Sequence, residues 1–185
     1  AHALESEVSA PLAPELTFPR PLGRRHFFIF VDASREWGLG GWTLLTGPTG
    51  SLTLATLAAE YPPHIQARAR SSAAGAVSTG VLELAGALIT RNALRRRWPL
   101  SRLTIFIDNE AARFAINSAS SASAPMRAML APLLDSEQIL AVRCATADNR
   151  WADMLSRGEG AAVLAAAAAR GWATVTLRVS ADDWA

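Results

Sequence analysis

The sequence predicts an α/β fold in which a mixed five-stranded sheet carries helices on its faces. Two observations lead to this prediction. Three short strand-like segments follow one another with brief turns, which is typical of an antiparallel meander. Later apolar runs alternate with helical patterns, which indicates crossover connections to parallel strands. The length of 185 residues suffices for one domain with a buried core.

The meander is expected at residues 27–31, 37–45 and 51–57. The first of these segments is a run of aromatic and β-branched residues that ends at Asp32. The second is rich in glycine, and a turn with glycine and proline at 46–50 separates it from the third. We therefore expect these three strands to pair as neighbours in an antiparallel arrangement.

The rest of the chain predicts helices alternating with two further strands. Residues 58–78 have no assignable pattern and are interpreted as a long loop. A helix capped by Ser78 or Thr79 ends before Pro99, and a strand follows at 103–107. Helical spacing from Asn109 onward, a helix at 124–135, a strand at 139–144 and a helix at 151–169 complete the order β-β-β-α-β-α-α-β-α.

Composition and charge exclude several classes of protein. All 18 basic residues are arginine, and against 16 acidic residues they give a net charge of only +2, so the chain is not strongly basic. The single cysteine excludes an internal disulfide and fits a reducing compartment. No apolar run approaches the ~20 residues of a membrane span, and no signal-peptide pattern is present. We expect an intracellular protein, in the cytoplasm or nucleus, without a membrane partner.

The domain boundaries are expected near both ends of the chain. Residues 1–26 contain four prolines and no sustained periodicity, so they predict an extended lead-in or linker. Residues 27–170 form the expected domain, and residues 171–185 are a C-terminal extension.

Four carboxylates stand in apolar surroundings: Asp32 and Asp108 directly after apolar strands, Glu83 early in the first helix, and Asp153 in the last helical pattern. Carboxylates are rarely buried without a partner, so this set requires arginines or cations. Oxygen-only ligands favour Mg²⁺ or Mn²⁺. Each residue alone could equally cap a turn or occupy the first turn of a helix. The interpretation as a site therefore depends on the four residues together.

The sequence resembles the ribonuclease H domain attached to reverse transcriptases, particularly those of retrotransposons, over about residues 27–157. The most specific part of the resemblance is an ending similar to Asn-x-x-Ala-Asp-x-Leu-Ser-Arg, and this ending with the Asp-Asn pair looks most like the tyrosine-recombinase class of retrotransposons. The matching segments are Phe30-Val31-Asp32-Ala33-Ser34, Leu82-Glu83-Leu84-Ala85, Ile107-Asp108-Asn109 and Asn149-Arg150-Trp151-Ala152-Asp153-Met154-Leu155-Ser156-Arg157.

The resemblance implies a ribonuclease H-like fold and cleavage of the RNA strand of an RNA/DNA hybrid with two Mg²⁺ ions, which Mn²⁺ would replace. By this likeness Asp32 bridges both ions, Asp153 helps to hold the ion that activates water, and Glu83 with Asp108 holds the ion beside the leaving 3′ oxygen. A reverse transcriptase polymerase domain in the same parent polypeptide is the implied partner. The sequence departs from many cellular members, because no histidine shortly precedes Asp153 and no basic insertion separates it from Asp108.

Several further residues are candidates for nucleic-acid binding. The arginines at the end of the first long helix either complement the helix dipole or contact phosphates, and both interpretations stay open. Ser34 and Asn109 adjoin the carboxylates and are expected to contact the nucleic-acid backbone. The full set of candidates is Ser34, Asn109, Arg91, Arg95, Arg96, Asn149 and Arg157.

Two other functions remain open at this point. The first is a ribonuclease H fold kept only as a scaffold or nucleic-acid-binding module in a larger assembly, which the weak net charge mildly favours. The second is a different nuclease on the same fold. Against it, Ser34 stands where proofreading exonucleases have a second carboxylate, and the last carboxylate is Asp153 rather than the glutamate of transposases.

Overall fold

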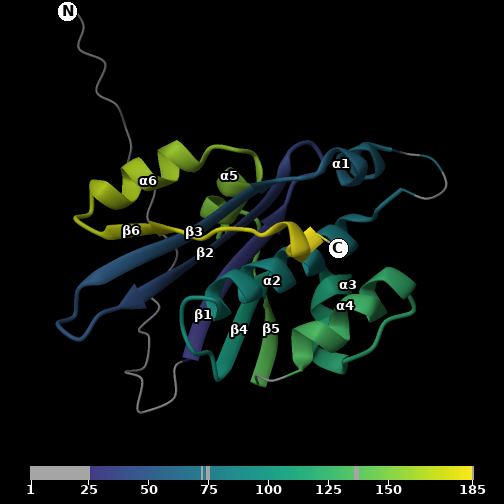
Figure 1. Cartoon of the computed structure of the whole chain (residues 1–185), viewed down its shortest axis with the longest axis horizontal. Helices are drawn as coiled ribbons and strands as arrows, with labels where there is room; N and C mark the ends of the chain where they lie inside the picture. Colours follow the sequence, from purple (N-terminus) through teal and green to yellow (C-terminus); the bar gives the residue numbers. More distant parts are fainter. Residues whose placement is uncertain (1–25, 72, 74–75, 136–137, 185) are drawn as a thin grey trace, which may run out of the picture.

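A single mixed sheet with helices on both faces forms the protein, as the computed structural model in Figure 1 shows. The structure describes residues 26–184 except 72, 74–75 and 136–137. The expected lead-in at 1–26 therefore lies, apart from His26, outside the described residues. No helix in the described part of the chain is both long and apolar enough to cross a membrane.

The sheet has the strand order β5-β4-β1-β2-β3-β6. β1 pairs antiparallel with β2 and β2 with β3, whereas β4, β5 and β6 join in parallel to β1, β4 and β3. The strands are β1 (His26–Ala33), β2 (Gly38–Thr46), β3 (Leu52–Glu60), β4 (Arg102–Ile107), β5 (Gln138–Arg143) and β6 (Ala173–Thr176). The prediction of an antiparallel meander with parallel additions is confirmed.

The sheet has six strands rather than the expected five. The additional strand, β6, lies in the segment interpreted as a C-terminal extension, and it pairs with the outer edge of β3. Its four residues are too few to show an alternating pattern. Part of the expected C-terminal extension therefore belongs to the sheet. A 3₁₀ turn at Ala181–Trp184 follows β6.

The helices are α1 (Pro63–Arg70), α2 (Thr79–Arg95), α3 (Glu110–Ser118), α4 (Ala124–Leu134), α5 (Arg150–Ser156) and α6 (Gly160–Ala168). Two of them correct the expectations. α1 lies inside the segment interpreted as a loop, because Pro63 starts the helix, where its missing N–H costs nothing. The single helix expected at 151–169 is two helices, because Gly158 adopts a left-handed φ of 82° between α5 and α6.

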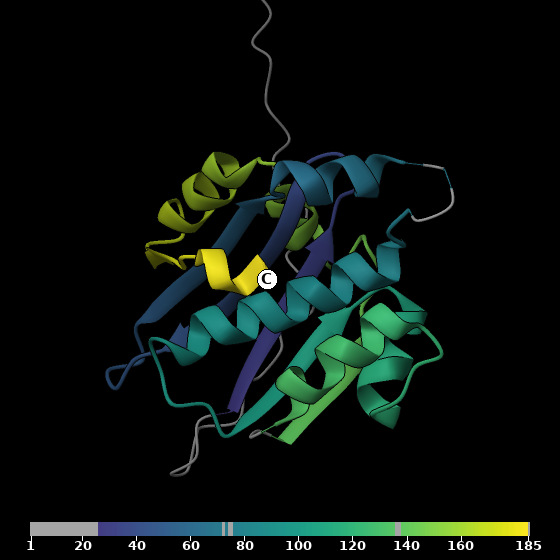
Figure 2. The ribbon, with the colours of Figure 1, turned by 45° about the vertical axis from the view of Figure 1, so that its right-hand side comes forward.

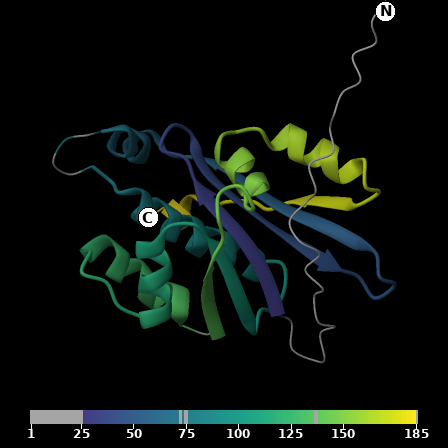
Figure 3. The same cartoon turned by 180° about the vertical axis from the view of Figure 1, so that it is seen from behind.

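The helices cover the two faces of the sheet in separate groups. α2 crosses one face, with α3 and α4 packed beside it (Figure 2), and the main apolar core lies beneath these helices. α5 and α6 lie on the opposite face (Figure 3), where Trp151, Leu155 and Val163 pack against Leu54 of β3. The sheet is therefore buried on both sides near its centre, as the apolar strands require.

The outer edge of strand β5 forms hydrogen bonds with a side chain from α3. Asn117 of α3 donates from Nδ2 to the carbonyl oxygen of Ala141 at 2.8 Å, and its Oδ1 accepts from the Ala141 N–H at 2.8 Å. The amide side chain thus pairs with the strand backbone as a neighbouring strand would. These contacts hold α3 directly against β5.

Candidate active site

Two of the four candidate carboxylates meet at one edge of the sheet because β1 and β4 are parallel neighbours. Phe30 of β1 lies opposite Phe106 of β4, so Asp32, near the end of β1, and Asp108, directly after β4, lie at the same edge of the sheet. In open α/β sheets this carboxyl edge is where sites form.

The other two carboxylates reach this edge from opposite faces of the sheet. Glu83 is on α2 and Asp153 is on α5. Electrostatic interactions join Asp32 to Asp108, Asp153 and Glu83, and join Glu83 to Asp108. The structure therefore brings all four residues into one cluster around Asp32.

Adjacent glycines of β2 explain how both helices come so close. Gly40 pairs with Asp32, and a Cβ atom on Gly40 would lie 2.1 Å from the Ala152 carbonyl oxygen of α5. A Cβ on Gly41 would lie 2.5 Å from Oγ1 of Thr90 on α2. Because successive residues of a strand face opposite sides, these two glycines admit the α5 backbone on one face and the Thr90 side chain of α2 on the other. The glycine-rich segment of the sequence thus positions the helices that carry Asp153 and Glu83.

Each carboxylate of the cluster accepts a hydrogen bond on one of its oxygens, and these bonds orient the side chains. The pairs are Ser156 Oγ to Asp32 Oδ2 at 2.6 Å, the Asn109 N–H to Glu83 Oε2 at 3.1 Å, Thr146 Oγ1 to Asp108 Oδ2 at 2.7 Å, and Arg157 Nε to Asp153 Oδ1 at 2.8 Å.

Sequence reasoning missed the roles of Ser156 and Thr146. Ser156 lies within the segment 149–157 that carries the resemblance, and this position could have identified it as a candidate site residue. Thr146 lies in the irregular loop between β5 and α5, where nothing in the sequence distinguishes it.

Burial, together with the crowding of negative charge, raises the pKa of the two buried carboxyl groups. Burial, followed by the charge and hydrogen bond of Asp108, raises the pKa of Glu83 to about 9, although the Asn109 N–H opposes this shift. Burial also raises the pKa of Asp32, and Asp108 and Asp153 add to the shift while the Ser156 hydroxyl and Arg157 oppose it. Without a cation, Glu83 therefore keeps its proton at neutral pH.

The cluster has the donor chemistry of a hard cation site but is not closed around one. Its ligands would all be carboxylate oxygens, which suit Mg²⁺ and Mn²⁺. In the part of the chain that the structure describes, no three His, Cys, Asp or Glu side chains are already arranged to hold a metal ion. A cation bound here would therefore require the carboxylates to move closer together and would replace the proton of Glu83.

The structure corrects the expectation that Arg91 contacts nucleic acid. Its side chain is 2% exposed, and its guanidinium donates to Asp135 and, at 2.8 Å, to the carbonyl oxygen of Pro132. Arg91 therefore joins α2 to α4 in the interior, where it cannot reach a ligand.

Arg95 and Arg96 are on the surface but far from the cluster. They lie 12 and 13 residues beyond Glu83 on the same helix, or roughly 18 Å along its axis. Arg95 pairs with Asp135, and Arg96 pairs with Asp183 and also donates to the carbonyl oxygen of Arg178. Both arginines therefore stabilise neighbouring segments of the chain.

The remaining candidates differ in exposure. Asn149 is 1% exposed and donates to the Val31 carbonyl oxygen at 2.8 Å, so it fastens the start of α5 to β1 rather than meeting a ligand. Ser34 is buried, and its hydroxyl accepts from the Glu36 N–H. Asn109 caps α3. Arg157 stays more than half exposed beside Asp153, which leaves it accessible at the edge of the cluster.

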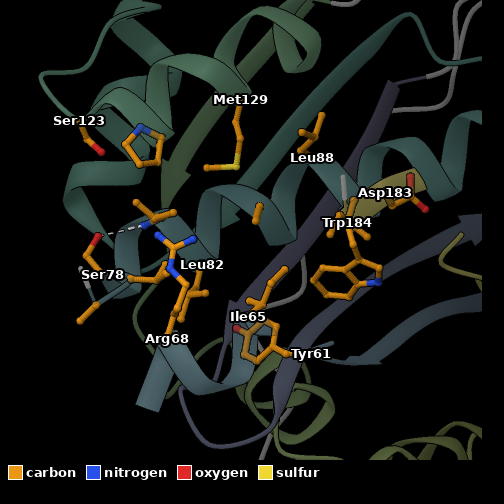
Figure 4. Close-up of a pocket in the computed structure, with 16 residues that line it drawn as sticks. Tyr61, Ile65, Arg68, Ser78, Leu82, Leu88, Ser123, Met129, Asp183 and Trp184 are labelled. Atoms are coloured by element: carbon orange, nitrogen blue, oxygen red, sulfur yellow. Dashed lines mark hydrogen bonds between the residues drawn. The ribbon is translucent and has the colours of Figure 1, made fainter. Parts of the chain in front are cut away.

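A cavity of about 430 Å³ is a further feature of the structure (Figure 4). Residues of α1, α2, α4 and the C-terminal 3₁₀ turn line it, and Ile65, Leu82, Met129 and Trp184 are among its mostly apolar lining. None of the four clustered carboxylates lines it. The cavity adjoins the cluster, however, because Tyr61, which lines the cavity, interacts electrostatically with Asp32 and Glu83.

Comparison with known proteins was made at the levels of sequence and structure. No protein-family model and no curated protein sequence matches the chain. The solved structures that match its fold include the N-terminal RNase H domain of a Mycobacterium tuberculosis protein, solved as a fusion with maltose-binding protein, LC11-RNase H1 isolated from compost, and RNase H1 of the halophilic archaeon Halobacterium salinarum.

The structural matches cover most of this chain and nearly all of each neighbour. The M. tuberculosis domain is 13% identical, with a TM-score of 0.50, and the match covers 72% of this chain and 98% of that one. The compost enzyme is 14% identical, with a TM-score of 0.50, covering 75% and 98%. The archaeal enzyme is 13% identical, with a TM-score of 0.46, covering 75% and 99%. The first two likenesses, together with the sheet topology, show that this chain has a ribonuclease H-like fold.

Proposed function

We propose that the chain is a metal-dependent endonuclease that hydrolyses the RNA strand of RNA/DNA hybrids. The observation that carries this proposal is the convergence of four carboxylates from β1, α2, the end of β4 and α5 at the carboxyl edge of the sheet. Gathering four carboxylates, two of them buried, costs free energy, and such clusters are concentrated at functional sites. The ribonuclease H-like fold and the sequence resemblance supply the reaction class.

The four carboxylates have separable roles in this proposal. Asp32 would hold both ions, Glu83 and Asp108 would complete the site of one, and Asp153 would complete the site of the other. Two bound divalent ions supply Lewis-acid stabilisation of the entering and leaving oxygens. Glu83 would also accept a hydrogen bond from the ribose 2′-hydroxyl, the group that distinguishes RNA from DNA. Arg157 would partly neutralise Asp153 until an ion does so.

We also propose that the parent polypeptide is a retroelement reverse transcriptase. Support comes from the segment 149–157, whose likeness to the ending of retroelement ribonuclease H domains is the most specific in the chain. Three residues of this segment, Asn149, Ser156 and Arg157, contact β1 or the clustered carboxylates. Adding a retroelement polymerase domain should increase hybrid affinity, because the net charge of this chain is only +2.

The decisive experiment is cleavage of a labelled RNA/DNA hybrid by the purified chain in Mg²⁺ and in Mn²⁺. We expect products with 5′-phosphate and 3′-hydroxyl ends, and no cleavage of duplex DNA. Asp32→Asn should abolish cleavage while the circular dichroism spectrum stays unchanged. Asp182→Asn is the matched control, since this exposed aspartate lies in the C-terminal 3₁₀ turn, outside the cluster. Equal cleavage of duplex DNA would favour a different nuclease.

A second candidate is a catalytically silent module that binds nucleic acid or serves as a scaffold. Two observations favour it: among the described residues no three ligands are already placed around a cation, and Arg91, Arg95 and Arg96 are engaged in contacts within the chain. Hybrid binding without cleavage in either ion, unchanged by Asp32→Asn, would select this function over the nuclease.

A further inference from the structure

The Ser156 hydroxyl connects helix α5 to strand β1 within the cluster. Ser156 is fully buried on α5, and its Oγ lies 2.6 Å from Asp32 Oδ2 and 2.8 Å from the Asp153 carbonyl oxygen. A hydroxyl has one proton to donate, and an ionised carboxylate is the stronger acceptor, so the bond to Asp32 forms when that residue is charged. A Cβ on Gly40 would lie 2.4 Å from the Ser156 nitrogen, so the backbone of Ser156 is held tightly against β2.

The Thr146 hydroxyl has the same relation to the second aspartate. Thr146 is exposed in the loop between β5 and α5, and its Oγ1 donates to Asp108 Oδ2 at 2.7 Å. Backbone bonds hold the two ends of this loop: the Cys144 N–H donates to Ile107, and the Asn149 N–H donates to Ala145. The backbone bonds hold the loop in shape without the Thr146 hydroxyl. The bond from this hydroxyl to Asp108 is therefore available to orient the carboxylate.

Both hydroxyls orient carboxylates that other elements carry. Asp32 belongs to β1 and Asp108 follows β4, whereas the donors come from α5 and from the loop before it. Rotation about the last torsion of aspartate is broad, so without such a donor the carboxylate plane is poorly defined. In both cases the donor contacts Oδ2, and Oδ1 takes no part in the bond.

We propose that Ser156 and Thr146 are positioning residues that orient the Asp32 and Asp108 carboxylates for divalent ions. The inference rests on the proposed function and adds two residues to it. Second-layer partners of this kind hold ligand oxygens in place before the ion arrives, so less ordering is required on binding. The two hydroxyls would then limit the rotation of these carboxylates while the cluster closes around the ion.

Thr146 allows the cleaner test because it is exposed. Thr146→Val removes the hydroxyl and keeps the shape, and Thr146→Ser keeps the hydroxyl. Mn²⁺ binding to each full chain, measured by titration calorimetry, should weaken roughly 10-fold or more in Thr146→Val and recover in Thr146→Ser. The Mg²⁺ concentration for half-maximal hybrid cleavage should rise in parallel, while the rate at saturating Mg²⁺ changes far less. Thr49→Val is the matched control, because Thr49 is exposed in the β2–β3 turn.

Ser156→Ala provides the second arm, with thermal melting in EDTA to show that the chain is folded. If this buried substitution prevents folding, the Thr146 pair alone decides the question. Unchanged Mn²⁺ affinity in Thr146→Val, or weakening that Thr146→Ser does not repair, would overturn the positioning role while leaving the nuclease proposal intact. An unmodified chain that binds neither ion would instead overturn the proposed function itself.

Discussion

Replacing Glu83 by glutamine should stabilise the metal-free protein near neutral pH and change its stability little near pH 5. Burial and Asp108 raise the pKa of Glu83 to about 9, compared with 4.5 for an unperturbed glutamate. Between these pH values the folded protein holds a proton that the unfolded chain releases. The free energy of unfolding of the unmodified protein therefore falls as pH rises through this window.

The size of the effect follows from the same two pKa values. Each pH unit above 4.5 costs about 1.36 kcal/mol until the pH reaches the folded-state pKa. At pH 7.5 the cost is about 4 kcal/mol, and at pH 5 it is below about 1 kcal/mol. Glutamine keeps the shape of the side chain and has no proton to take up. The stability gained by Glu83→Gln should thus differ by about 3 kcal/mol between the two conditions.

Urea unfolding in EDTA at pH 5.0 and pH 7.5 measures this difference. Glu60→Gln is the matched control, since Glu60 is exposed at the end of β3. In the unmodified protein, Mg²⁺ should restore stability at pH 7.5, whereas Glu83→Gln should respond less. Equal effects of Glu83→Gln at both pH values would show that Glu83 is ionised in the metal-free fold, which would refute the argument from carboxylate crowding.

Two further predictions concern packing around the site. Gly40→Ala should reduce stability by about 3 kcal/mol or more and abolish hybrid cleavage, because the new methyl group would meet the Ala152 carbonyl oxygen at 2.1 Å; Gly160→Ala, with its nearest neighbour at 3.7 Å, should be tolerated in the same melting and cleavage assays. Arg91→Ala should lower stability by about 3 kcal/mol in urea unfolding, with no specific loss of hybrid affinity in fluorescence anisotropy, and selective loss of affinity would show that Arg91 binds the ligand.

Much of the fold could be predicted from the sequence because local patterns and tertiary structure agree. The apolar runs at 27–31 and 103–107 are central strands, and Ser78 does cap α2 by accepting from the Val81 N–H. Where local signals were weak or ambiguous, prediction was wrong. A Pro-Pro pair was interpreted as a loop although its second proline begins α1, and a run of alanines concealed the break at Gly158.

The residues of the candidate site also differ in how far the sequence alone could identify them. The four carboxylates could be selected because charged residues in apolar segments are conspicuous, and their roles as metal ligands stay predictions. The sequence could not separate the buried arginine from the exposed ones, because the pattern of a helix end does not reveal which segments pack against it. Arg91 is buried only because α4 returns to cover it, and its partner Asp135 is 44 positions away in the chain. The role of Thr146 likewise depends on the folded position of its loop beside Asp108, which no local pattern indicates.

The pairing of Asn117 with β5 bears on how the molecule behaves in a crowded solution. An outermost strand presents backbone donors and acceptors that invite a strand from another molecule, and such pairing leads to aggregation. The side chain of Asn117 occupies both groups of Ala141 in the middle of that strand. An intruding strand would have to displace it before a continuous ladder could form. One amide on a neighbouring helix thus protects the open side of the sheet without shortening the strand or adding charge to it.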